Sequence, residues 1–181
     1  MKIIYEELNL ISIKNFHRIN FFERIKVNSI LERNKCYVSD LGYNYPIYEE
    51  QTSFFSNIKT KFIIQSKNIF GNFTISARYN NTCWCYRSKG DQYDSIYHDH
   101  LNTSTVNSVY YHQICKGDSI SFLDSKDEEL IYYPDQNELL IFPNYVRHKP
   151  NKPVGNRIRY SINMEIMTQE TSDQLFNYAL Y

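Results

Sequence analysis

Two histidines separated by one aspartate lie in the stretch IYHDHLN, residues 96–102. His98, Asp99 and His100 carry side chains that bind metal ions or transfer protons, so the stretch is either a polar turn or part of a metal site. In an extended chain, residues i and i+2 project to the same side. His98 and His100 would then bind one ion together, with Asp99 directed away from it.

A third candidate ligand, His148, follows the apolar stretch ELLIFPN, residues 138–144. The apolar run predicts a short buried strand that Pro143 ends. The loop after this strand would bring His148 over the mouth of a β-barrel. His148 would thus complete a site of three histidines.

An arginine and a serine follow His148 in the segment RIRYSINMEI, residues 157–166. Arg159 lies eleven residues after His148, and Ser161 lies two residues further on. A guanidinium binds a carboxylate in two-point geometry, and a serine hydroxyl adds a third hydrogen bond. We therefore predict that Arg159, or Arg157 on the same strand face, binds an anionic co-ligand beside the metal.

The residues of this segment alternate between apolar and polar, which predicts a strand with two unlike faces. One face holds Ile158, Tyr160, Ile162, Met164 and Ile166, and the other holds Arg157, Arg159, Ser161, Asn163 and Glu165. The CWC stretch, residues 83–85, is either a metal half-site or a strand with both sulfurs on one face. No second cysteine pair completes a zinc site, which favours the strand.

Other segments predict further elements. Residues 106–124 read as a β-hairpin whose turn is formed by residues 116–118, and His112 within it is expected to be a packed core histidine. Residues 48–59 predict a helix that is followed by a strand. Short helices are expected within residues 29–36 and within 172–180, the second capped by Ser172.

Composition limits the class of protein. The chain has 181 residues, 17 tyrosines and no formal net charge. This length suggests one domain, and the abundance of aromatic residues favours β-structure. The charge balance makes a nucleic-acid partner unlikely. No signal peptide and no run of roughly 20 apolar residues is present, so we expect a cytoplasmic protein without a membrane partner and with free thiols. The oligomeric state stays open.

Several of these motifs together resemble the catalytic core of the 2-oxoglutarate and Fe(II)-dependent oxygenases, above all the small members from phages and bacteria. The resemblance covers roughly residues 80–166. Its elements, in order, are Trp84, the turn at 89–91, His98 and His100, residues 109–111, Phe142 and Pro143, His148, and residues 159–163. One departure is that a histidine stands at position 100, where a carboxylate is common in the family, so the site either has three histidines or uses Asp99 as its carboxylate. Asn137 replaces a frequent glycine and tolerates the same left-handed turn.

The resemblance implies a mainly β fold with flanking helices, a double-stranded β-helix of the jelly-roll or cupin-like type. It implies that residues 1–181 form one domain, with a supporting region at 1–80, the catalytic core at 81–166 and a C-terminal helix at 167–181. It further implies a dioxygenase that hydroxylates a small molecule or a peptide side chain. Fe(II) would be held by His98, His100 and His148, and 2-oxoglutarate by Arg159, Ser161 and Tyr110 or Tyr111.

Two other interpretations remain open at this point. One is a cupin-like metalloenzyme with three histidines and no 2-oxoglutarate. The other is a non-catalytic jelly-roll binding module. Metal content and 2-oxoglutarate turnover separate them, because the oxygenase needs both, the cupin-like enzyme needs metal only, and the binding module needs neither.

Overall fold

Two antiparallel sheets and three helices make up the described part of the chain in the computed structural model. The structure describes residues 1–33, 37–39, 42–46, 53–77, 83–89 and 96–178. None of the helices in these ranges is long and apolar enough to cross a membrane.

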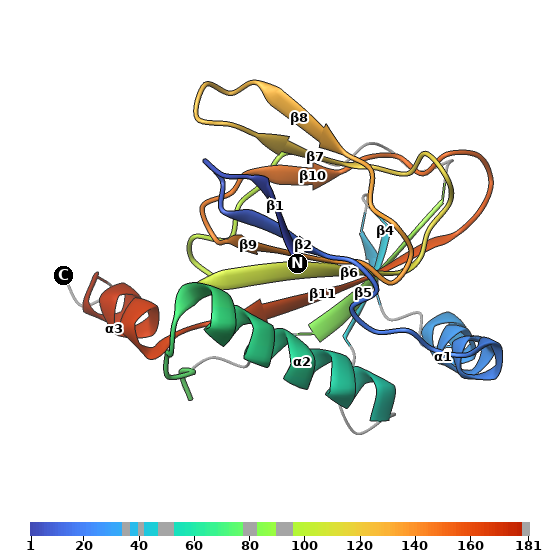
Figure 1. Cartoon of the computed structure of the whole chain (residues 1–181), viewed down its shortest axis with the longest axis horizontal. Coiled ribbons are helices and arrows are strands. Elements are labelled where there is room, and N and C mark those ends of the chain that lie inside the picture. The colour runs from blue at the N-terminus through green and yellow to red at the C-terminus, as the bar shows by residue number, and fades with distance from the viewer. Residues whose placement is uncertain (34–36, 40–41, 47–52, 78–82, 90–95, 179–181) are drawn as a thin grey trace.

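The large sheet has eight strands. Their spatial order is β1 (Lys2–Tyr5), β2 (Leu10–Ile13), β9 (Leu139–Pro143), β6 (Val106–Gln113), β11 (Arg159–Ile166), β5 (Cys83–Ser88), β4 (Gly42–Pro46) and β3 (Tyr37–Ser39). The small sheet has the order β10 (His148–Pro150), β7 (Ile120–Leu123) and β8 (Glu129–Tyr132). Figure 1 shows the small sheet over one face of the large sheet, while helix α2 (Ser53–Phe70) covers the other face.

Strand alternation divides the interior into two cores. On one side of the large sheet, apolar residues of β11 such as Ile162 pack with Phe54 and Phe62 of α2. On the other side, Tyr111 and Phe142 pack with Phe122 of the small sheet. Full burial of each such side chain stabilises the fold by roughly 1.5–3 kcal/mol. The predicted arrangement of two facing sheets with helices from the first 80 residues on the outer side is confirmed.

The predicted faces of β5 and β11 are also confirmed. Cys83 and Cys85 are buried with the apolar residues of β11 in the core beneath the helices, whereas Trp84 faces the space between the sheets. Cys83, Cys85 and Cys115 are free cysteines. Cys36 lies outside the described residues.

The predicted hairpin of residues 106–124 is wrong. A turn does form, with the amide of Asp118 donating to the carbonyl of Cys115 and Gly117 at φ 94°. However, the Asp118 carboxylate also accepts from the amide of Val154, 2.8 Å away, and so ties the turn to the segment after β10. β7 then pairs with β8 and β10 in the small sheet. Alternation predicts a strand, but it does not predict which strand will be its neighbour.

The predicted strand after residue 59 is wrong as well, because α2 continues to Phe70. Phe54, Ile58, Phe62 and Ser66 recur every four residues and are all buried on one side of this helix. A stripe with this spacing is helical in period, although the segment KFIIQ within it is rich in β-forming residues. The expected start at residues 48–52 lies outside the described residues.

The two shorter predicted helices both form with different limits. Helix α1 (Phe21–Arg33) starts well before residue 29, and residues 34–36 are outside the described part. Helix α3 (Gln169–Tyr178) starts before Ser172, so the predicted cap is wrong. Thr168 caps it instead, with its hydroxyl oxygen 3.4 Å from the amide nitrogen of Thr171.

Two residues take the local roles that the sequence predicted for them. Asn137 has a φ of 64°, in the left-handed region. His112 is fully buried, and its Nε2 lies 2.8 Å from the side-chain oxygen of Asn28. Burial, followed by the nearby charge of Arg24, lowers the pKa of His112 to about 3. His112 is therefore a neutral packed histidine. His17 is half-buried with its ring against Phe54.

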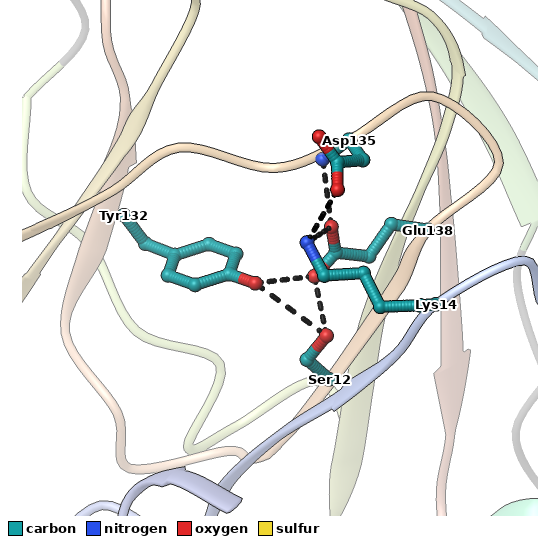
Figure 2. Close-up of polar contacts among 5 residues, drawn as sticks. All are labelled: Ser12, Lys14, Tyr132, Asp135 and Glu138. Atoms are coloured by element: carbon teal, nitrogen blue, oxygen red, sulfur yellow. Dashed lines mark hydrogen bonds and ion pairs between the residues drawn. The ribbon is translucent and has the colours of Figure 1, made fainter. Parts of the chain in front are cut away.

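A buried carboxylate ties the two sheets together at the start of β9. Glu138 is fully buried and accepts hydrogen bonds from the hydroxyls of Tyr132 and Ser12, from Nζ of Lys14 at 2.7 Å and from the amide of Asp135 at 2.6 Å. Figure 2 shows these five residues, which we call the Glu138 cluster, converging from β2, β8 and the turn before β9. Burial acts against the charge of Lys14, but its hydrogen bonds to Asp135 and Glu138 raise the pKa of Lys14.

Candidate metal centre

The three histidines singled out in the sequence are held by backbone pairing at one end of the small sheet. His148 opens β10 and pairs with Phe122 of β7. His98 forms an isolated antiparallel bridge with His148, with N–O distances of 3.0 and 2.9 Å. The amide of His100 donates to the carbonyl of Asn144, 2.9 Å away. The His-X-His segment thus lies beside β10 without forming a regular strand.

One ring nitrogen from each histidine lies within 4.8 Å of the others, and no other such group of metal-binding side chains is found in the described part of the chain. The ring centroids are 4.5 Å apart for His98 and His148, 5.3 Å for His98 and His100, and 5.2 Å for His100 and His148. His148 is buried, His100 is half-buried and His98 is exposed, so the group opens toward solvent on one side.

Each of the three rings has an acceptor at Nδ1. His98 Nδ1 lies 3.2 Å from the carbonyl oxygen of Ile96, and His148 Nδ1 lies 3.0 Å from that of Val146. His100 Nδ1 lies 2.6 Å from Oε1 of Glu165. An acceptor at Nδ1 holds the proton there and leaves the lone pair of Nε2 for a metal ion. The donor set therefore fits a transition metal bound through three imidazoles.

The surroundings also keep the rings of His148 and His98 neutral, which is the form that binds metal. Burial, then the charge of His98, lowers the pKa of His148 to about 3, against a smaller opposing effect of the Val146 carbonyl. Burial of its ring also lowers the pKa of His98. Neutral imidazoles that face one another are expected of a cluster arranged for a cation, since protonation would make them repel.

Asp99 stands outside the group. Its side chain is exposed, and its Oδ1 lies 3.3 Å from the amide nitrogen of Leu101 in a local turn. This placement agrees with the expectation that the residue between the histidines is directed away from them.

A cavity of about 170 Å³ runs from the histidines between the two sheets. Its walls are mainly apolar and aromatic, and polar groups enter from β11. The residues that line it are Trp84, Tyr86, His98, His100, Asn107, Ser108, Val109, Tyr111, Ile120, Phe142, His148, Pro150, Arg159, Ser161, Asn163, Met164 and Glu165.

Arg159 is the cation of this cavity and is only 2% exposed. Its Nε donates to the hydroxyl of Ser88 at 3.1 Å, and its Nη1 lies 3.4 Å from the carbonyl oxygen of Ser119. No ion pair joins Arg159 to a carboxylate among the described residues. A buried guanidinium with only neutral partners is costly, so this position favours an added anion. Arg157 is exposed and does not line the cavity.

Ser161 lies between two tyrosines on the cavity face, because it pairs with Tyr86 of β5 and Tyr111 of β6. Burial raises the pKa of Tyr111, which keeps its phenol protonated. Tyr110, expected at the same site, does not lie there. It faces the helices, and its hydroxyl donates to the carbonyl of His17 at 2.7 Å. Adjacent residues of a strand take opposite faces, so only one of the two tyrosines reaches the cavity.

Glu165 and Asn107 are polar cavity residues that were not assigned a role from the sequence. Glu165 was placed on the polar face of its strand, but nothing in the sequence pointed to its contact with His100. Asn107, its cross-strand neighbour, is buried; its Oδ1 accepts from Ser104, and its side-chain nitrogen has no hydrogen-bond partner in the described residues. Both lie where β6 and β11 pair, and only the folded sheet places them near the histidines.

No protein-family model matches the sequence, and no curated protein matches it. Solved structures are similar in fold. A prolyl hydroxylase from Trichoplax adhaerens, in complex with a hypoxia inducible factor peptide, aligns with a TM-score of 0.70 and 14% identity over 91% of this chain and 86% of that one. A prolyl-4-hydroxylase from Pseudomonas putida aligns with a TM-score of 0.65 and 11% identity over 88% and 92%.

HygX from Streptomyces hygroscopicus, with nickel and 2-oxoglutarate bound, aligns with a TM-score of 0.65 and 9% identity over 92% of this chain and 84% of that one. The predicted mainly β fold with flanking helices, the double-stranded β-helix of 2-oxoglutarate oxygenases, is confirmed by these likenesses. At these identities the comparisons show the fold alone.

Proposed function

We propose that this protein is a non-haem Fe(II)- and 2-oxoglutarate-dependent dioxygenase that hydroxylates a small molecule or a peptide side chain. One observation carries the proposal: a single cavity holds three histidines that face one another and a buried arginine without an anionic partner in the described chain. A metal ion would bind the histidines, and a carboxylate would pair with the arginine. The oxygenase fold supports the same conclusion.

In this proposal His98, His100 and His148 hold the iron through Nε2 and leave its remaining positions open. Arg159 pairs with the far carboxylate of 2-oxoglutarate. Ser161 and Tyr111 lie beside it on neighbouring strands and add hydroxyl groups to the same end. The apolar walls of the cavity exclude water from the space between the metal and the arginine.

The iron and the keto acid together supply the oxidising chemistry. Over one cycle, 2-oxoglutarate, dioxygen and a substrate C–H bond become succinate, carbon dioxide and a C–OH group. One oxygen atom enters succinate and the other enters the product. The chain's own contribution is to bind, orient and shield these reactants.

The substrate class rests on the opening of the site. His98 is exposed, so a substrate would approach the metal from that side. The mainly apolar and aromatic lining of the cavity suits a small metabolite or a peptide side chain better than a polyanion, and the zero formal charge agrees.

An anaerobic titration tests the function directly. Metal-free protein is given Fe(II) and then 2-oxoglutarate, and the visible charge-transfer band of the chelated keto acid is followed. We expect one metal per chain and a band that appears only when both are present. Metal binding without the band would favour the cupin-like enzyme, and the absence of metal binding would favour a non-catalytic module.

A further inference from the structure

We propose that Glu165 is a positioning residue for His100: its carboxylate contacts the ligand and not the ion. The inference rests on the metal role proposed for the histidines, and it adds a residue that the histidine motif does not contain. Glu165 Oε1 lies 2.6 Å from His100 Nδ1, and their side chains are 10% and 15% exposed. Both line the cavity.

The contact with Glu165 differs in kind from those of the other two histidines. His98 and His148 meet backbone carbonyl oxygens at Nδ1, which carry no charge. His100 meets a carboxylate that is closer than either of those oxygens. Hydrogen bonds with an ionised acceptor are shorter and roughly twice as strong as neutral ones.

Thr103 is the other neighbour of His100 Nδ1, but its Oγ1 is 3.4 Å away. At that distance the hydroxyl contributes little to the orientation of the ring. Thr103 therefore offers a matched control. Its side chain lies beside the same nitrogen as Glu165, but it is uncharged and more distant from that nitrogen.

The position of Glu165 follows from strand alternation in β11. It shares the cavity face with Arg159, Ser161 and Asn163, and it lies at the opposite end of this face from the arginine. One strand thus provides a cation where a carboxylate co-ligand would bind and an anion where the metal would bind. Asn107 pairs with Glu165 across the sheet and forms part of the same end of the cavity.

The carboxylate would affect the metal in two ways. It holds the proton of His100 on Nδ1, which directs the Nε2 lone pair to the ion. It also makes the imidazole a stronger donor and places one negative charge close to the ion. Three imidazoles alone are neutral, so a divalent ion bound by them keeps its full charge. Glu165 would offset part of that charge through its contact with His100, without touching the ion itself.

The test measures Mn(II) affinity by calorimetry, without 2-oxoglutarate. Loss of an outer partner of this kind typically costs 10- to 100-fold in metal affinity. We expect a loss in that range for Glu165→Gln, which keeps the shape and removes the charge. Glu165→Asp keeps the charge at a greater distance and should lose less. Thr103→Val should bind Mn(II) nearly as wild type does.

The double variant separates positioning from general structure. In a His100→Ala background, Glu165→Gln should cause no further loss, because its effect acts through the His100 ring. Nitrogen NMR of the metal-free protein gives a second signal: wild type should hold His100 in the Nδ1-protonated tautomer, and Glu165→Ala should release it. Wild-type affinity in Glu165→Gln, or an equal further loss in the double variant, would overturn the inference.

A different outcome would assign Glu165 another role. If Glu165→Gln abolishes Mn(II) binding and His100→Ala retains it, the carboxylate is itself a ligand and the positioning role is overturned. The proposed function is tested separately, since a failure to bind 2-oxoglutarate would overturn the oxygenase and leave all of these metal affinities interpretable.

Discussion

The Glu138 cluster and the three histidines both join the large sheet to the small one, yet they differ in how their polar atoms are satisfied. Glu138 is fully buried and meets two hydroxyls, an ammonium and a backbone amide of the same chain. The histidines direct Nδ1 to acceptors and leave Nε2 without a protein partner in the described residues. Their neighbour Arg159 has no anionic partner in the part of the chain that the structure describes.

The difference separates polar groups that stabilise the fold from polar groups that are suited to bind a ligand. A buried network in which every group is paired stabilises one arrangement of the chain. A buried group that lacks its natural partner reduces stability, and it persists where a ligand supplies that partner. By this criterion the Glu138 cluster holds the sheets together, whereas the histidines and Arg159 fit the roles proposed for them in binding a metal and an anion. The predictions below test this division, from the largest expected effect to the smallest.

Removal of the Glu138 carboxylate should cause the largest loss of stability. In Glu138→Ala, the hydroxyls of Ser12 and Tyr132 lose their charged acceptor, and each hydrogen bond to a charged group contributes roughly 1.5–3 kcal/mol. Urea denaturation of the metal-free protein measures the change. Mn(II) affinity should be unaltered.

Asp135→Ala is the matched control for this variant. Asp135 also pairs with Lys14, at 2.8 Å, but its side chain is 73% exposed. An exposed pair contributes about 0–1 kcal/mol, so the loss should be much smaller. Equal losses for Glu138→Ala and Asp135→Ala would mean that burial is not what makes the cluster stabilising.

Replacement of His148 should remove the stabilisation that metal provides. At a metal concentration 1,000 times Kd, wild type gains about 4 kcal/mol of unfolding free energy. His148→Ala should lose most of this gain, because only two imidazoles remain. Thermal unfolding with and without Mn(II) measures it. Asp99→Ala should retain the gain, and a protein that loses metal binding through Asp99→Ala but not through His100→Ala would refute the ligand set.

Replacement of Arg159 should weaken 2-oxoglutarate binding without lowering the stability of the metal-free protein. Hydrogen bonds to charged groups contribute roughly 1.5–3 kcal/mol, so Arg159→Ala should weaken 2-oxoglutarate binding about ten- to a hundred-fold in the Mn(II) protein. Arg159→Lys should restore only part, since it lacks the two-point geometry. Calorimetry measures these affinities, and metal affinity should barely change.

The stability of an arginine variant completes this test. Arg159→Met removes a buried charge with no carboxylate partner in the described chain, so the metal-free protein should unfold no more easily than wild type. Arg157→Ala serves as the exposed comparison and should leave 2-oxoglutarate binding unchanged. A large loss of stability in Arg159→Met would mean that Arg159 stabilises the fold, as the Glu138 cluster does.

His112 should have the smallest effect on stability near neutral pH, and this effect should grow as the pH falls. Its pKa falls from 6.5 to about 3 on folding, so it is neutral in the fold and protonated in the unfolded chain below pH 6.5. Its contribution is complete above pH 6.5 and is lost as the pH falls toward 3, by about 1.4 kcal/mol per pH unit. His112→Gln should flatten the stability profile in that range by about this slope.

The metal should leave the His112 effect unchanged, because Asn28 already satisfies Nε2 of this ring. Denaturation at several pH values, for wild type and His112→Gln, measures the difference in slope. If both proteins lose stability in parallel, burial does not control the protonation of His112.

The sequence by itself determined the features that depend on local spacing. Alternation predicted the two faces of β11, with Arg159 and Ser161 on the polar side, and the apolar run before Pro143 predicted a buried strand. The left-handed turn at Asn137 and the packed state of His112 also followed from residue type and neighbours. Each of these depends on residues only a few positions apart.

The tertiary structure decided every feature that depends on which distant segments pair. It placed β7 in the small sheet instead of in a hairpin with β6, because side-chain alternation carries no information about the neighbouring strand. It brought Tyr111 and not Tyr110 to the cavity, and Glu165 to His100. The last contact joins residues 65 positions apart, so only the packing of one sheet on the other could create it.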